Sequence, residues 1–229
     1  MSKKGKNKNK KHESDKNSNW NKKKILYIHG FMSSANSHTA SRLRRSYGNI
    51  YEILSPELNG DPHYSLSVIN DLIAKEKPIL ITASSLGGFY ALMCESGDTP
   101  VVLVNPCIDP YTHLQRYLDQ ELTYHSKRDD GSETYTLTLP VLERFKEYNV
   151  AERVKSKREH ICTLLSSNDE VLGDSHYQFF KRISEETNNP HYLDHVYMHS
   201  NVGHRLYPFG YTTLELYVDS ILEDLRGVY

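Results

Sequence analysis

Residues 79–93 read Ile-Leu-Ile-Thr-Ala-Ser-Ser-Leu-Gly-Gly-Phe-Tyr-Ala-Leu-Met. An apolar run typical of a buried strand leads into Ser85 and then directly into a stretch typical of a helix. Ala83 and Gly87 lie two positions before and after Ser85, where a sharp strand-to-helix turn brings backbone segments close together. The stretch therefore predicts a nucleophilic serine at such a turn, with the N–H of Leu86 free to donate to an oxyanion at the helix N-terminus.

Two other interpretations of this stretch stay open. Ser85 also suits the N-cap of an ordinary helix that follows a strand. Ser84 is the neighbouring hydroxyl, but Thr82 and Leu86 flank it at the positions where Ser85 has small residues. We therefore favour Ser85 over Ser84.

Similar short apolar runs lie on both sides of this stretch. They are rich in β-branched residues and mostly do not alternate, which is typical of strands covered on both faces. Segments long enough for helices separate them, and this alternation predicts an α/β domain with a mostly parallel sheet and helices on both faces. We expect strands at 25–28, 50–54, 79–81, 101–104, 161–165 and 196–198, and helices at 36–46, 65–76, 87–96, 174–187 and 212–225.

The alternation is interrupted between residues 105 and 160. This stretch contains prolines, the polar run 126–133 and a pattern near 140–148 that predicts a helix. We expect residues 107–159 to form a small lid inserted into a single domain that spans residues 25–229.

Three further segments contain the partners that a nucleophilic serine needs. His29 and Gly30 follow the first strand, and the turn there is expected to supply a second oxyanion donor, the N–H of Phe31. His29 itself is better explained as a buried, hydrogen-bonded residue. Asp169 follows the strand at 161–165 and is placed to orient an imidazole, with Glu170 and Asp174 as alternatives.

The third segment ends in Gly203 and His204, after the last strand. The order Ser85, Asp169, His204 is the chain order of the triad in the α/β-hydrolase fold, with His204 as the general base. The sequence thus predicts a serine hydrolase that forms an acyl-enzyme on Ser85 and releases it to water.

These segments together resemble the YqiA/YcfP-type bacterial esterases. The resemblance rests on residues 27–34, 83–91, 104–106, 168–172 and 203–205 and covers the chain from about Ile25 onward. It implies hydrolysis of small-molecule esters or thioesters with short acyl groups, or of acyl-CoA, without a cofactor. Two residues depart from it: Ala83 stands where relatives usually carry Gly, and Asp109 stands where a basic residue is expected, which weakens the case for acyl-CoA.

Composition places limits on the other functions. The net charge is −1, but residues 1–24 hold ten lysines against Glu13 and Asp15, so we expect a disordered tail. The three cysteines predict free thiols in a reducing cytoplasm. Apolar runs of four or five residues are too short for a membrane span. The sequence leaves the oligomeric state open.

The sequence leaves two alternatives to catalysis by a triad. His191, His195 and His199 recur every fourth residue, which on a helix would suggest a metal site. Because Pro190 and the apolar run 196–198 favour a strand, we expect no metal site there. The second alternative is a non-catalytic binding protein on the same scaffold, with the tail as the one segment able to contact RNA or another anionic surface.

Overall fold

The computed structural model describes residues 22–157, 161–200, 202–205 and 210–227. Residues 1–21 of the expected tail lie outside these ranges. Lys24, the last residue assigned to the tail, is instead the first residue of a strand. The chain therefore enters the sheet one residue earlier than expected.

Six parallel strands form the main sheet. β3 lies next to β1 and β4 near its middle, and every neighbouring pair runs parallel, as predicted. In spatial order the strands are β2 (Glu52–Leu54), β1 (Lys24–Ile28), β3 (Leu80–Ser84), β4 (Val101–Val104), β7 (Ile161–Ser166) and β8 (Val196–His199).

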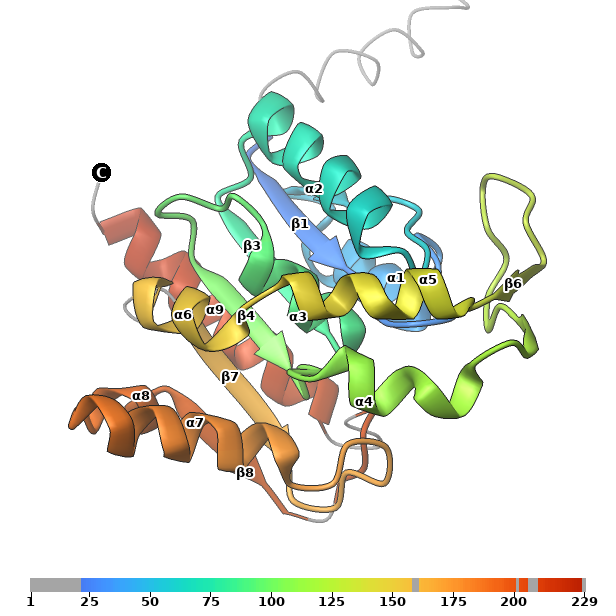
Figure 1. The fold of residues 1–229 in the computed structure, drawn as a ribbon. Helices are drawn as coiled ribbons and strands as arrows, with labels where there is room; N and C mark the ends of the chain where they lie inside the picture. Colours follow the sequence, from blue (N-terminus) through green and yellow to red (C-terminus); the bar gives the residue numbers. More distant parts are fainter. Residues whose placement is uncertain (1–21, 158–160, 201, 206–209, 228–229) are drawn as a thin grey trace, which may run out of the picture.

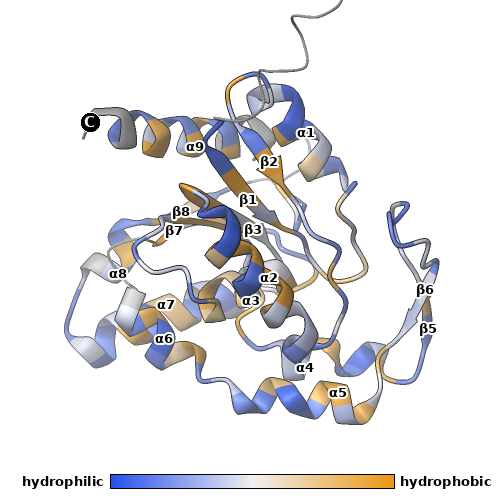
Figure 2. Cartoon of the chain, turned by 90° about the horizontal axis from the view of Figure 1, so that it is seen from above, coloured by the Kyte–Doolittle hydropathy of each residue, from blue (hydrophilic) through white to orange (hydrophobic). Residues whose placement is uncertain are grey.

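Helices cover both faces of this sheet (Figures 1 and 2). Side chains of alternating strand positions enter two separate cores, one under each helical layer. On one side lie α1 (His38–Tyr47) and α9 (Gly210–Gly227); on the other lie α2 (Pro62–Glu76), α3 (Leu86–Met93), α6 (Val150–Lys157) and α7 (Ser175–Thr187). Within the described ranges, no helix has both the length and the apolar composition of a bilayer span.

The segment between β4 and α6 crosses the end of the sheet at which the strand arrowheads point (Figure 1). It consists of α4 (Pro110–Leu114), η1 (Gln115–Tyr117), the antiparallel strands β5 (Glu121–Thr123) and β6 (Thr134–Thr136), α5 (Leu139–Glu143) and η2 (Arg144–Glu147). Leu142 and Phe145 are buried in the core beneath α2 and α3, so this half of the expected lid segment packs as part of the domain.

The region before the last strand differs from the sequence-based expectation. His191–Asp194 forms the short helix α8, and the extended backbone begins only at Val196. Pro190 is the N-cap of this helix, a position where its missing N–H leaves no helical hydrogen bond unmade.

Candidate active site

The carboxyl ends of parallel strands meet at one edge of a sheet, where α/β proteins place their ligand sites. At this edge, β1 leads into His29 and Gly30, β3 into Ser85, β4 into Asn105 and β7 toward Asp169. His204 follows β8 by five residues. The topology thus brings the predicted residues to the same side of the sheet.

Ser85 occupies a sharp turn between β3 and α3. Its φ of +53° and ψ of −125° are backbone angles that residues other than glycine rarely adopt. Because Leu86 is the first residue of α3, its N–H has no acceptor within the helix. A Cβ atom at Gly87 would lie 2.2 Å from the carbonyl oxygen of Ile28, so only glycine fits where α3 crosses β1. Ala83 is fully buried in the strand before the turn.

Gly30 lies directly against this serine. A Cβ atom at Gly30 would lie 3.0 Å from the Ser85 Cβ and 3.5 Å from its Oγ. The absence of a side chain at Gly30 lets the backbone of the turn after β1 approach the hydroxyl. This is the placement that a second oxyanion donor requires.

His29 holds the peptide that contains the Phe31 N–H, the expected second donor. Its Nδ1–H donates to the carbonyl of Gly30 at 2.9 Å, and its Nε2 accepts from the N–H of Leu58 at 3.3 Å. Burial lowers the pKa of His29, consistent with a neutral ring that donates at one nitrogen and accepts at the other. Since the Gly30 carbonyl and the Phe31 N–H belong to one planar peptide, fixing the carbonyl also fixes the direction of the N–H. The sequence analysis expected a buried, hydrogen-bonded His29, and in the structure the ring is buried and bonded at both nitrogens.

His204 and Asp169 form a hydrogen-bonded pair. The Nδ1 of His204 lies 2.8 Å from Oδ2 of Asp169, whose side chain is fully buried. Oδ1 of Asp169 accepts the N–H groups of Val171 and Leu172 at 2.9 and 2.8 Å. Burial opposes the charge on Asp169, but the bonds from His204, Leu172 and Val171 outweigh it and hold the pKa of this carboxyl below its ordinary value. Asp169 is therefore a carboxylate able to fix the orientation of the imidazole.

The two alternative acids have other partners. Oε2 of Glu170 accepts the backbone N–H of His204 at 2.8 Å, and an added Cβ at Gly203 would lie 2.7 Å from the same oxygen. Asp174 is the N-cap residue of α7 and accepts a bond from Gln178. Neither acid bonds the imidazole in the described structure.

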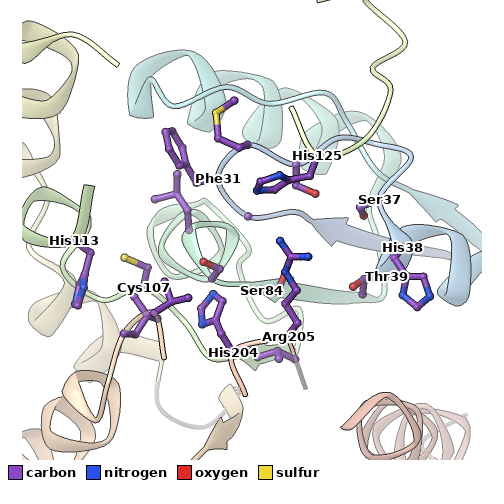
Figure 3. A pocket seen from close by; sticks show the side chains of 18 of the residues that line it. Phe31, Ser37, His38, Thr39, Ser84, Cys107, His113, His125, His204 and Arg205 are labelled. Carbon is purple, nitrogen blue, oxygen red and sulfur yellow. The ribbon is translucent and has the colours of Figure 1, made fainter. Parts of the chain in front are cut away.

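Ser85 and His204 open onto one cavity of about 550 Å³, together with Phe31 and Leu86. Figure 3 shows His204 reaching into this cavity below Phe31. The hydrogen bonds of the described residues do not include one between the Ser85 hydroxyl and the imidazole. Such bonds are often long in the absence of substrate and shorten in the reacting complex.

A profile of the uncharacterised protein family UPF0227 matches residues 24–202, most of the chain. The chain belongs to UPF0227. This assignment confirms the resemblance to the YqiA/YcfP proteins, because that is the same family. The matched residues include Ser85 and Asp169 and end two residues before His204.

Several solved structures share the fold of this UPF0227 protein. Est1E from Butyrivibrio proteoclasticus, solved with ferulic acid bound, has a TM-score of 0.62 and 13% identity over 90% of this chain and 88% of its own. The esterase domain of a Rhodothermus marinus protein has a TM-score of 0.57 and 18% identity, covering 85% of each chain. Alpha/beta hydrolase domain-containing protein 10 from mouse has a TM-score of 0.56 and 12% identity over 88% of this chain and 90% of its own. The predicted α/β-hydrolase fold is thus confirmed.

Sequence reasoning missed two residues that hold His204 in the UPF0227 chain. The amide of Asn105 donates to the carbonyl of His204 and to Oγ of Ser166, both at 2.8 Å, and its Oδ1 accepts the N–H of Ser166 at 2.7 Å. Ser166 Oγ in turn donates to the carbonyl of Gly203 at 2.9 Å. Their shared signal in the sequence is a polar residue at the end of an apolar strand.

The cysteine thiols are poor alternatives to Ser85 as nucleophiles. Cys107 lines it, but burial raises the pKa of its thiol, which keeps it protonated and weakly nucleophilic. Burial also raises the pKa of Cys162, to about 12. In the part of the UPF0227 chain that the structure describes, no group of three His, Cys, Asp or Glu residues is arranged to hold a metal ion.

Proposed function

We propose that this protein is a serine hydrolase of carboxylic esters or thioesters, with Ser85 as nucleophile, His204 as general base and Asp169 as the acid that orients it. The observation that carries the proposal is the Asp169–His204 hydrogen bond of 2.8 Å at a cavity that also contains the strained turn of Ser85. A strained serine beside an oriented imidazole is the arrangement that acyl transfer needs.

In the proposed reaction, Oγ of Ser85 attacks the acyl carbonyl while His204 takes the hydroxyl proton. The carbonyl oxygen becomes an oxyanion, which the N–H groups of Phe31 and Leu86 stabilise; one such donor is typically worth about 3 kcal/mol. His204 then gives its proton to the leaving alcohol or thiol as the tetrahedral intermediate collapses to an acyl-enzyme. Water, deprotonated by His204, attacks this ester and releases the acid and the free serine.

The size of the cavity fits small substrates. A volume of about 550 Å³ lies within the range of small-molecule sites. Apolar residues such as Leu114 and Tyr117 line it beside the serine. We therefore propose short acyl esters or thioesters as the substrates, with acyl-CoA as one thioester to be compared.

The test is the variant Ser85→Ala. We expect turnover of 4-nitrophenyl butyrate to fall by about 10⁴-fold or more, because the attacking atom is gone. A labelled fluorophosphonate should modify the wild-type protein and leave Ser85→Ala unmodified. Ser84→Ala is the matched control: its hydroxyl bonds Tyr27 at 2.9 Å, and this variant should still be labelled. Wild-type turnover or labelling by Ser85→Ala would refute the assignment.

A further inference from the structure

The cavity has two chemically different ends. At one end lie the rings of Phe31 and Tyr117, with centroids 5.5 Å apart, and Leu114 beside them. Elsewhere the lining includes the polar residues Ser126, His125 and Arg205. In Figure 3, Phe31 lies above His204, and His125 and Arg205 lie to the right of these two residues. A substrate that spans the site therefore meets apolar surface at one end and polar groups at the other.

Arg205 gives the polar end a positive charge. It directly follows His204, and its side chain extends into the cavity toward His125 (Figure 3). Glu170 is the one carboxylate among the described lining residues, and the N–H of His204 engages it. No described carboxylate forms an ion pair with Arg205. Arg205 is exposed, so solvent and salt partly screen its charge, but its guanidinium is available to an anion that enters the cavity.

The residues around Arg205 suit a ligand with acceptor oxygens. Burial and the nearby guanidinium both lower the pKa of His125, which favours a neutral imidazole with one N–H to donate. The backbone of His125 is fixed by its N–H bond to the Met32 carbonyl at 2.9 Å.

The other arginine of the cavity is already engaged. The guanidinium of Arg116 lies over the ring of Tyr117 at 5.1 Å and donates to the carbonyl of Val171 at 3.3 Å. It thus belongs to the apolar end. Of the two arginines that line the cavity, Arg205 is the one with a free guanidinium in the described structure.

We propose that the ester substrate carries an anionic oxygen group, a carboxylate or a phosphate, which Arg205 binds while the apolar part of the substrate lies against Phe31 and Tyr117. The inference rests on the proposed serine hydrolase function and names its substrate class. Arginine suits this role because its planar fork can donate two parallel hydrogen bonds to a carboxylate or a phosphate.

Pairs of esters that differ only in charge test the inference. In 3-carboxyphenyl butyrate and 3-carbamoylphenyl butyrate the leaving groups have nearly the same shape, and only the first is anionic. We expect wild-type kcat/KM to be about tenfold higher for the acid than for the amide, mainly through KM. Arg205→Gln should bring this ratio close to one, and Arg205→Lys should keep part of it. Ser85→Ala supplies the blank.

Two further comparisons identify the anionic group. Phenyl hemisuccinate and phenyl succinamate place the charge on the acyl side, so the pair with the larger ratio tells which part of the substrate faces Arg205. A phosphonate in place of the carboxylate distinguishes phosphate from carboxylate recognition. Raising the ionic strength should lower every ratio that depends on Arg205, because salt screens exposed charges.

Control variants separate this effect from general damage. Arg45→Gln removes the same charge from an exposed position of α1 and should leave the ratios as in the wild type. Wild-type ratios near one in all pairs would overturn the inference. The inference would also be overturned if Arg116→Gln lost the acid-to-amide ratio of kcat/KM while Arg205→Gln kept it. The same holds if Arg205→Gln lowered kcat/KM equally for the acid and the amide of each pair. If no ester is cleaved and no fluorophosphonate reacts, the hydrolase proposal fails and the inference falls with it.

Discussion

At the scale of single residues, Asn105 holds the backbone of His204 through its side-chain amide. Its φ of +43° places it in the left-handed region, which asparagine tolerates better than most residues. The side chain is fully buried, and both amide hydrogens and the amide oxygen have partners. With Glu170 on the N–H of His204 and Asn105 on its carbonyl, the backbone of the proposed base is held at both ends.

Asn105→Asp tests this positioning role. Aspartate has the same shape, but a carboxylate cannot donate and would face the carbonyl of His204. We expect kcat for 4-nitrophenyl butyrate to fall by about 10- to 100-fold with KM little changed, because a small displacement of the base weakens proton transfer. Fluorophosphonate labelling should slow in parallel. Thr163→Val is the control, since the Thr163 hydroxyl is buried in β7 and has no partner among the described residues. An unchanged kcat in Asn105→Asp would contradict the role.

The sequence predicted some residues of the site and missed others for a physical reason. Ser85, Asp169 and His204 each follow a strand, and chemistry restricts which residue types act there. A polar residue such as Asn105 or Ser166 at a strand end equally predicts an ordinary turn. Their roles depend on contacts with the segment after β8, more than 30 residues further along the chain, and such contacts leave no local pattern.

At the scale of elements, the segment that connects β5 and β6 is hydrogen-bonded to the loop after β1. The N–H of His125 donates to the carbonyl of Met32, a residue with a φ of +55°. Arg128, near the hairpin tip, is buried: it pairs with Glu57 at 3.3 Å and donates to the carbonyl of Leu58 at 2.7 Å. Glu57 also accepts the N–H of Ala35. Hydrogen bonds and an ion pair therefore connect the hairpin to the loop after β2, which contains Glu57, and to the loop after β1, which contains Phe31.

The variant Arg128→Met tests how much this connection stabilises the protein. Methionine has a similar length but leaves the Glu57 carboxylate without its cation, so the free energy of unfolding should fall by about 3–5 kcal/mol. Urea unfolding measures the change. Lys127→Met, at the neighbouring exposed position, should change it by less than about 0.5 kcal/mol. Adding Glu57→Gln to Arg128→Met should restore part of the stability; if it restores none, the buried charge is not the cause.

The elements themselves were predictable to different degrees. All six strands of the main sheet were predicted, because apolar β-branched runs mark strands that are covered on both faces. β5 and β6 are three residues long with half-exposed or exposed side chains, so they carry no such signal. Arg128 lies in a polar run that looks like solvent-exposed loop, and only tertiary contacts bury it.

At the scale of the whole molecule, buried histidines link stability to pH. His29 and His176 are 3% and 1% exposed, and burial lowers the pKa of both. In the unfolded chain a histidine takes up a proton near pH 6.5, whereas these two stay neutral in the fold until lower pH. The free energy of unfolding should therefore decrease as the pH falls below about 6.5. Asp169, with its lowered pKa, stabilises the fold above about pH 4, and this contribution is lost only below that.

His176→Leu isolates one of these contributions. Neither ring nitrogen of His176 has a hydrogen-bond partner among the described residues, so leucine removes two unpaired polar atoms. We expect the variant to be more stable than the wild type, with a larger difference at pH 5.5 than at pH 7.5. The pH slope of its free energy of unfolding should be smaller by up to about 1.4 kcal/mol per pH unit. The free energy of unfolding of both proteins is measured by urea unfolding across this pH range. If it changes with pH by the same amount in wild type and variant, His176 has the same pKa in the folded and unfolded states, and the prediction is wrong.

The order of the strands along the chain affects when the nascent polypeptide can become active. Ser85 and the turn that holds Phe31 belong to β3 and β1, whereas His204 follows β8, the edge strand formed last along the chain. Under the proposed mechanism, a nascent polypeptide that has left the ribosome only as far as β7 has its serine but no base to activate it. Hydrolysis would then begin only after synthesis has passed residue 204, which protects cellular esters from incomplete chains.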